Sequence, residues 1–224
     1  MSHLDVIRLN NINFTVKSGS FDLLILQDIS FAIKKGITVA ITGASGSGKT
    51  SLLNIMAGLD LPTTGDVFYE NQEITHLSED ERAKLRARRV GFIFQSFQLL
   101  PNLTGLENVM LPLEMNHYED AFSKASYWLD KVGLSNRGHH YPLQLSGGEQ
   151  QRVAIARAFA VEPDILFADE PTGNLDKKTG QTVADLLFTL NEQHKTTLVI
   201  VTHDEALAGR CQLHWRLDGG KLLC

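Results

Sequence analysis

The sequence predicts an α/β fold with a mostly parallel sheet, an antiparallel β-rich N-terminal part and an inserted helical part. Short continuous apolar runs recur along the chain, as is typical of strands that are buried on both faces of a parallel sheet. Segments with helical periodicity separate these runs, which indicates strands that alternate with helices. Residues 1–35 instead alternate apolar and polar side chains, a pattern typical of antiparallel strands.

Size and composition favour one globular domain that spans residues 1–224. The hydrophobic content of 43% is ordinary, and the net charge of −5 argues against nucleic acid as a partner. The two cysteines, Cys211 and Cys224, lack metal or redox spacing and are expected to be free thiols. Residues 1–5 do not resemble a signal peptide, and no apolar run approaches the ~18 residues of a membrane-spanning helix. Action at a membrane would therefore require another chain.

Residues 43–50, here called the phosphate loop, match the pattern G-x-x-x-x-G-K-[ST]. A β-branched run at 37–42 predicts a buried strand before it, and apolar positions within 51–57 predict a helix after it. The loop would thus place backbone N–H groups and a helix N-terminus around a polyphosphate. Lys49 is expected to reach the β- and γ-phosphates, and the Thr50 hydroxyl to ligate Mg²⁺. The candidate nucleotide-binding residues of this region are Gly43, Ala44, Ser45, Gly46, Ser47, Gly48, Lys49, Thr50 and Ser51.

The elements around this loop follow from the same patterns. Two antiparallel strands joined by a turn at residues 18–20 are expected before the loop, and a turn at 62–65 and a hairpin at 67–74 after it. Ser78 and Glu81 form a capping box that opens a short helix. Its basic end, residues 84–89, allows two interpretations. The segment could bind phospholipid headgroups or a partner, or its cations could gather there because the helix dipole favours them.

The middle of the chain is expected to be mostly helical. A buried strand is predicted at 90–94 and is followed by Gln95, after which residues 97–160, approximately, form the inserted helical part. Thr104 and Glu107 make a second capping box. Aromatic and apolar residues of 122–132 follow a helical period, and residues 145–150, here called the signature segment, open another helix. The core then resumes with strands at 165–168 and 198–201 around an amphipathic helix at 177–194.

Polar residues follow several of these strands, and such residues collect in one crevice at the carboxyl edge of a parallel sheet. Asp169 is expected to hold Mg²⁺ and Glu170 to polarise the attacking water in phosphoryl transfer. Two adjacent acids could also form a solvated turn, but the apolar strand before them favours the catalytic role. His203 could be a structural histidine, but its place after a core strand favours contact with the γ-phosphate. The adjacent His139 and His140 lack metal-ligand spacing and are expected in a loop.

The phosphate loop, Leu145-Ser146-Gly147-Gly148-Glu149-Gln150 and Ile165-Leu166-Phe167-Ala168-Asp169-Glu170, in this order, resemble an ABC-type ATPase over essentially the whole chain. The resemblance implies a P-loop NTPase core, ATP hydrolysis with Mg²⁺, and a head-to-tail homodimer that closes on two ATP. It implies that Ser146, Gly147 and Gly148 bind the γ-phosphate of ATP held by a second copy. It also makes Gln95 a metal-contacting glutamine that couples the nucleotide to a transport domain, and Asp176 a residue of the dimer contact.

Finer motifs resemble one branch of this family. These motifs are Phe94-Gln95-Ser96-Phe97, Leu103-Thr104 with Leu106-Glu107-Asn108-Val109, and Asp169-Glu170-Pro171-Thr172-Gly173-Asn174-Leu175-Asp176. The branch contains macrolide-export (MacB), lipoprotein-release (LolD) and division (FtsE) ATPases, and the YbbA proteins are the most similar group.

By this resemblance, a separate multi-pass permease would hold the chain at the cytoplasmic face of the bacterial inner membrane. The work would be done on lipids, lipoproteins or hydrophobic compounds. The alternatives are a signalling or scaffold ATPase of the division type and a soluble ABC ATPase. The family's aromatic residue for adenine falls near Val16 here, so either Phe14 replaces it or base recognition is weak.

Overall fold

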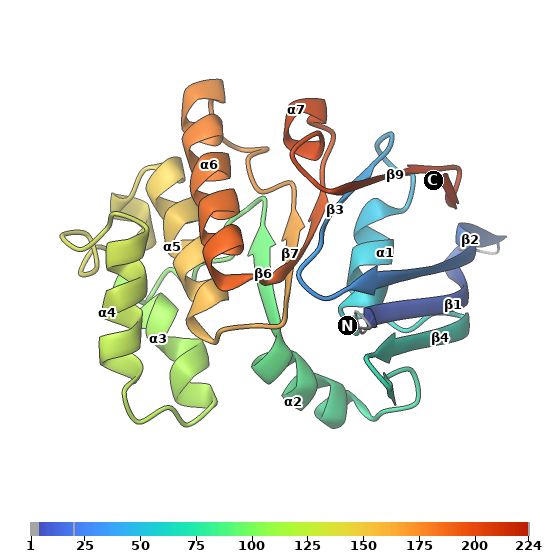
Figure 1. Cartoon of the computed structure of the whole chain (residues 1–224), viewed down its shortest axis with the longest axis horizontal. Coiled ribbons are helices and arrows are strands. Elements are labelled where there is room, and N and C mark those ends of the chain that lie inside the picture. The colour runs from blue at the N-terminus through green and yellow to red at the C-terminus, as the bar shows by residue number, and fades with distance from the viewer. Residues whose placement is uncertain (1–4, 20, 224) are drawn as a thin grey trace. The chain divides into compact units, whose positions relative to one another are not determined.

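The computed structural model describes residues 5–19 and 21–223, which form two compact units. The first unit is drawn from residues 1–86 and 196–224, and the second is formed by residues 87–195. The boundary between them falls inside helix α2, Glu79–Arg89. Figure 1 shows the elements of both units coloured along the chain.

The first unit begins with the antiparallel sheet that the sequence predicts. Its strands are β1 (Asp5–Ser18), β2 (Phe21–Lys34), β4 (Thr64–Tyr69) and β5 (Gln72–Glu73), in the spatial order β2-β1-β4-β5. Ile7, Leu9 and Ile12 of β1 are buried against the apolar positions of β2, such as Ile29 and Ile33. The alternation of apolar side chains is therefore the inner face of this sheet. Ser20, part of the predicted turn, lies outside the described residues.

The turn predicted at residues 62–65 is wrong in its second half, because β4 already begins at Thr64. Gly65 has a φ of 93°, and a Cβ on it would lie 2.4 Å from the backbone oxygen of Asn11. The pairing of β1 with β4 shifts its register between Asn10 and Asn13 at this point. Gly65 thus marks a close approach of two strands at a β-bulge, and not a chain reversal.

The same unit contains four further strands beside helix α1. They are β3 (Thr38–Thr42), β8 (Thr197–Val201), β9 (Leu213–Asp218) and β10 (Lys221–Leu223), in the order β10-β9-β3-β8. Strand β3 pairs in parallel with β8 and β9, while β10 runs antiparallel to β9. Every residue of β3 and of β8 is buried, which explains why these strands appear as continuous apolar runs. Helix α1 (Lys49–Met56) begins with the last two residues of the phosphate loop, and α7 (Glu205–Ala208) follows β8.

The second unit combines a parallel strand pair with helices. Strands β6 (Val90–Phe94) and β7 (Ile165–Asp169) are parallel, and Phe94 pairs with Asp169. The helices are α3 (Gly105–Met115), α4 (Ala121–Lys131), the 3₁₀ turn η1 (Pro142–Gln144), α5 (Gly147–Ala160) and α6 (Lys177–His194). Helices α3, α4 and α5 pack on one another, and α5 also contacts α6 and β6 (Figure 1). The predicted α/β class, with an antiparallel N-terminal sheet and mostly parallel core strands, is confirmed.

The helix predicted from residues 122–132 exists as α4, but its apolar face is narrower than expected. Trp128 is buried, and its ring stacks on that of Phe159 with centroids 5.4 Å apart. Phe122 and Tyr127 are exposed instead. The Tyr127 ring packs edge-on against Trp128 and lies under the ammonium of Lys131. Its aromatic ring therefore makes these two contacts at the surface rather than in the core.

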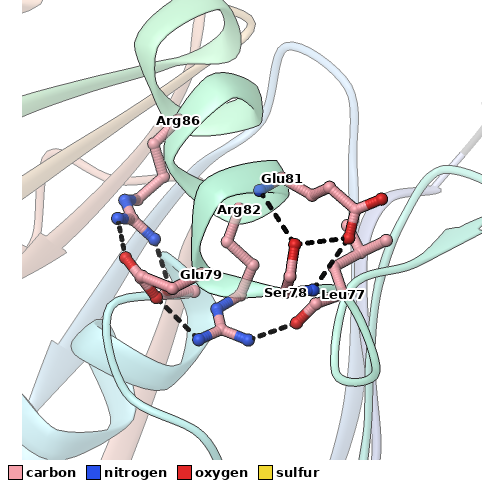
Figure 2. A network of polar contacts seen from close by, with 7 residues as sticks. Leu77, Ser78, Glu79, Glu81, Arg82 and Arg86 are labelled. Atoms are coloured by element: carbon pink, nitrogen blue, oxygen red, sulfur yellow. Dashed lines mark hydrogen bonds and ion pairs between the residues drawn. The ribbon is translucent and has the colours of Figure 1, made fainter.

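Two of the four cations in the basic end of α2, Arg86 and Arg89, form ion pairs within their own units. In Figure 2, Arg82 and Arg86 both turn toward Glu79, which forms ion pairs of 2.6 and 2.5 Å with them. Arg86 also donates to the backbone oxygen of Gly58, and Arg89 pairs with Asp164 at 2.8 Å. The capping box of Ser78 and Glu81 is formed as predicted. These contacts favour a structural role for the cations of residues 84–89 over a patch that binds phospholipid headgroups.

Candidate functional site

The phosphate loop of the first unit connects β3 to α1, and its backbone geometry requires glycine. Gly46 and Gly48 have φ values of 78° and 99°, in the left-handed region that disfavours other residues. Gly48 is the N-cap of α1, and a Cβ on it would lie 2.9 Å from Leu26 Cδ2 and 3.0 Å from the Ile25 oxygen. Strand β2 therefore lies so close to the loop that there is no room for a side chain at residue 48.

The side chains of Lys49 and Ser47 give the loop its chemical character. Lys49 Nζ donates to the backbone oxygens of Gly43 and Ala44, both at 2.9 Å, so its charge lies over the loop. Ser47 is buried, and its Oγ has no hydrogen-bond partner among the described residues. A buried hydroxyl without a partner is unfavourable in isolation. A cationic loop with an unsatisfied donor and a helix N-terminus fits a phosphate group well.

Two histidines of this unit, His203 and His214, are placed near the loop by the strands on either side of β3. Ile41 of β3 pairs with Val201 of β8, so the phosphate loop and His203 follow neighbouring strands at the same sheet edge. His203 is exposed, and Asp204 next to it caps α7. Thr42 is buried directly before the loop, and its Oγ1 lies 2.8 Å from Nε2 of His214 on β9. No motif in the sequence points to His214, because its partner is 172 residues away.

The second unit brings Gln95, Asp169 and Glu170 to one edge of its strand pair. Phe94 and Asp169 are paired residues at the ends of β6 and β7, so Gln95 and Glu170 come directly after them. Glu170 has a φ of 47°, an uncommon conformation for a residue other than glycine. Carboxylate and amide oxygens are ligands that suit Mg²⁺, so Asp169 and Gln95 of this unit fit this ion in their chemistry, as the hydroxyl of Thr50 does when considered by itself.

Helix α5 holds the chain segments that follow both strands. Arg157 donates to the backbone oxygens of Phe97 and Gln98, at 2.8 and 2.5 Å. These two residues have positive φ values of 61° and 50°, so the guanidinium fixes a strained turn after Gln95. Gln151, fully buried, donates from Nε2 to the Pro171 oxygen at 2.6 Å, just after Glu170. Sequence reasoning missed Arg157 and Gln151, because their partners are distant in the chain.

The signature segment forms the capped start of α5. Ser146 is the N-cap; its Oγ accepts from the Glu149 N–H, and Glu149 Oε2 accepts from Ser146 N–H and Oγ at 2.9 and 2.8 Å. Gly147 and Gly148 begin the helix, and a Cβ on Gly148 would lie 2.4 Å from Thr179 Cγ2. An open pocket of about 380 Å³ lies here. It is lined by Ser146, Gly148, Glu149, Arg152, Lys178, Thr179, Thr182 and Val183.

Asp176 caps α6 beside this pocket. Its Oδ1 accepts from the backbone N–H groups of Lys178 and Thr179, both at 3.1 Å. Hydrogen bonds from Thr179 and Lys178 hold the pKa of Asp176 below its usual range, so the carboxylate stays charged at neutral pH. The pocket lies between the starts of α5 and α6, and its lining includes the cations Arg152 and Lys178 and the acid Glu149.

The Glu149 cap predicts how the start of α5 responds to acid. Hydrogen bonds from Ser146 lower the pKa of Glu149 in the folded chain. A depressed pKa adds stability that is present above the unfolded pKa, about 4.3, and lost as the pH falls through the folded value. Glu149→Gln, which cannot ionise, should therefore lose less stability than wild type between pH 7 and pH 3. Urea unfolding at both pH values measures this, and equal losses in the two proteins would contradict it.

The remaining predicted residues lie in several other elements of the two units. Phe14 and Val16 are both half-buried in β1, and neither is distinguished as an adenine contact. His139 and His140 lie in the loop between α4 and η1. Cys211 is a free thiol, and burial raises its pKa to about 11, while Cys224 lies outside the described residues. Across residues 5–19 and 21–223, none of the helices combines the length and apolarity needed to span a bilayer.

Comparison with known proteins gives consistent matches along the chain. A sequence model described as "ABC transporter" matches residues 26–173. The ABC transporter ATP-binding protein YbbA of Escherichia coli is 50% identical over 220 residues, which cover 97% of this chain and 96% of that protein. The lipoprotein-releasing system ATP-binding protein LolD of Koribacter versatilis is 48% identical over 206 residues, with coverage of 91% and 92%.

Solved structures match equally well. A dimeric, post-hydrolysis state of the ATP-binding cassette MJ0796, bound to ADP and Pi, superposes with a TM-score of 0.90. It is 42% identical to this chain and covers 97% of both chains. A second dimeric structure of MJ0796, described as a bacterial ABC transporter cassette, gives the same TM-score at 43% identity.

Proposed function

Because this chain belongs to the ABC transporter family and is an ABC-type ATPase, we propose that two copies of it close head-to-tail on two ATP molecules and drive a separate membrane protein. The observation that carries this proposal is the presence of two glycine-rich helix starts in one chain, one in each unit. Lys49 covers the phosphate loop at the start of α1, while Ser146 and two glycines form the start of α5. One such start suffices for binding phosphate, so the second suits the nucleotide of another copy.

In this proposal, the first unit binds the phosphates of ATP. Lys49 exchanges the carbonyl oxygens of Gly43 and Ala44 for phosphate oxygens, and the Ser47 hydroxyl gains the partner that it lacks. The backbone N–H groups of residues 43–51 surround the phosphates. His203, at the same sheet edge, contacts the γ-phosphate. Mg²⁺, held by Thr50, Gln95 and Asp169, would neutralise phosphate charge when bound.

The second unit supplies the chemistry of hydrolysis. Glu170 polarises a water molecule, whose oxygen forms a bond to the γ-phosphorus while the bond to the ADP oxygen breaks. The products are ADP and inorganic phosphate, the two ligands named for the MJ0796 structure. Placement of Glu170 directly after the paired residues Phe94 and Asp169 supports this role, because it puts the base beside Gln95 and Asp169.

The partner copy completes each site in this proposal. Ser146, Gly147 and Gly148 of one copy would cap the γ-phosphate held by the other, and Asp176 would lie at the dimer contact. The dimeric state of the MJ0796 structures supports this arrangement. The whole chain, residues 1–224, would act as one ABC ATPase domain, with residues 97–160, approximately, as its helical subdomain.

We further propose that the partner is a multi-pass permease and that Gln95 transmits nucleotide state to it. The chain would then lie on the cytoplasmic face of the bacterial inner membrane, bound through that permease. The name of the LolD relatives, a lipoprotein-releasing system, makes lipoproteins, lipids or other hydrophobic molecules the favoured cargo class.

The test is affinity purification of the Glu170→Gln protein from detergent-solubilised native membranes with Mg-ATP, followed by mass spectrometry. The control is Glu192→Gln, which changes an exposed glutamate of α6 in the same unit. We expect one stoichiometric multi-pass protein with both variants. Recovery of ribosomal or DNA-repair proteins, or of no membrane protein, would contradict the transporter role. A membrane partner without a substrate cavity would favour signalling over transport.

A further inference from the structure

Two hydrogen bonds tie Asn174 to Gln95 in the second unit. Gln95 Nε2 donates to Asn174 Oδ1 at 3.0 Å, and Asn174 Nδ2 donates to the backbone oxygen of Gln95 at 2.9 Å. The two residues are 79 positions apart in the chain. One amide group therefore contacts both the side chain and the main chain of Gln95, which restricts the direction of that side chain.

This pairing also determines whether the oxygen or the nitrogen of the Gln95 amide can contact a further group. Its nitrogen is used by Asn174, so its oxygen Oε1 faces away from that contact. Only the oxygen can accept a hydrogen bond from water or ligate a hard cation. The opposite orientation of the amide would present N–H donors, which a cation repels. Asn174 thus selects the chemically useful orientation of Gln95.

Gly173, the neighbour of Asn174, packs closely against the same side chain. A Cβ on Gly173 would lie 2.9 Å from Gln95 Nε2 and 3.2 Å from its Cδ. The φ of Gly173 is outside the left-handed region, so alanine could adopt this backbone conformation. Alanine at residue 173 would consequently displace Gln95 without straining the main chain.

The pairing connects Gln95 to the turn at residues 170–176, and the proposed function gives these two segments different roles. Gly173 N–H donates to the Glu170 oxygen at 3.0 Å, so Asn174 belongs to the turn that starts at Glu170. The same turn ends at Asp176, the N-cap of α6. Both Gln95 and Asn174 are exposed, and exposed hydrogen bonds contribute little to folding stability. The pairing is therefore better explained by positioning than by stability.

We propose that Asn174 is a positioning residue that orients the Gln95 amide and links it to the turn carrying Glu170 and Asp176. This inference rests on the proposed function, in which Gln95 contacts the metal and couples to the permease. Movement of the 170–176 turn at the dimer contact would be passed to Gln95 through these two hydrogen bonds.

The first test observes the Gln95 side chain directly and needs no nucleotide. NMR of the ¹⁵N-glutamine-labelled chain gives the Nε2 signal of Gln95, which is assigned by its loss in Gln95→Ala. Asn174→Ala and Gly173→Ala should each move this signal to the position of a solvated glutamine amide. Asn136→Ala, which changes an exposed loop asparagine of the same unit, should leave it in place. An unchanged signal in Asn174→Ala would overturn the proposal.

The second test is kinetic and separates positioning from a merely structural role. Asn174→Ala should lower kcat for ATP hydrolysis by roughly 10- to 100-fold, because small displacements of catalytic groups have effects of this size. The KM for ATP should change little, since the phosphate loop is intact. In a Gln95→Ala background, Asn174→Ala should have no further effect, as expected for a residue that acts through Gln95. Multiplying effects in the double variant would overturn the proposal.

These two tests also distinguish failure of this inference from failure of the proposed function. A wild-type chain that does not hydrolyse ATP would contradict the proposed function. The NMR comparison would still decide whether Asn174 orients Gln95.

Discussion

Glu170→Gln is expected to lower kcat for ATP hydrolysis by about 10²–10⁴-fold, the usual effect of removing a general base. Glutamine keeps the shape of the side chain but cannot accept the proton of the attacking water. Glu170 lies after β7 in the second unit, while the phosphate loop belongs to the first. ATP affinity should therefore remain near the wild-type value. Steady-state phosphate release and equilibrium binding of a fluorescent ATP analogue measure the two quantities.

Glu192→Gln is the matched control for this change, because it removes an exposed carboxylate from the same unit. It should leave both kcat and ATP affinity unchanged. Hydrolysis by Glu170→Gln at a rate near that of wild type would refute the role of Glu170 as the base. A parallel loss of ATP binding would instead place Glu170 in binding rather than in catalysis.

Lys49→Ala should reduce kcat/KM by about 10³-fold, the upper range for removing one preorganised donor from a developing charge. The substitution removes the cation of the phosphate loop. It also removes both hydrogen bonds from Nζ to the oxygens of Gly43 and Ala44, which close the loop on itself. Unlike Glu170→Gln, it should weaken ATP binding as well as hydrolysis, and titration calorimetry with ATP separates the two effects.

Two variants show whether the charge of Lys49 and its position both matter. Lys221→Ala, an exposed lysine of β10 in the same unit, should behave as wild type. Lys49→Arg keeps the charge on a planar group of different shape, so it should recover only part of the ATP affinity. Unchanged ATP affinity in Lys49→Ala would contradict the assignment of residues 43–50 as the nucleotide site.

The sequence was most informative where structure is decided locally. The continuous apolar runs became the buried strands β3, β7 and β8, and α6 has the predicted bounds of 177 and 194. Capping boxes at Ser78 and Thr104 were visible because a Ser or Thr and a Glu three residues apart determine them. Local spacing also located the phosphate loop.

Features that depend on distant partners could not be predicted. Gly65 suggested a turn, but this position requires glycine because Asn11 of β1, more than fifty residues earlier in the chain, approaches it closely. Phe122 follows a helical period, yet it is 61% exposed, because periodicity does not tell which neighbour packs on a face. The contacts of Arg157, Gln151 and Asn174 likewise join segments that no motif connects.

We propose that ATP closes two copies of this chain on each other. The most direct measurement is the mass of the Glu170→Gln protein in solution by light scattering, with Mg-ATP and with Mg-ADP. We expect a dimer with ATP, a monomer with ADP, and no dimer when Ser146→Glu places a negative charge at the start of α5. A protein that remains monomeric while fully occupied by ATP would contradict the claim.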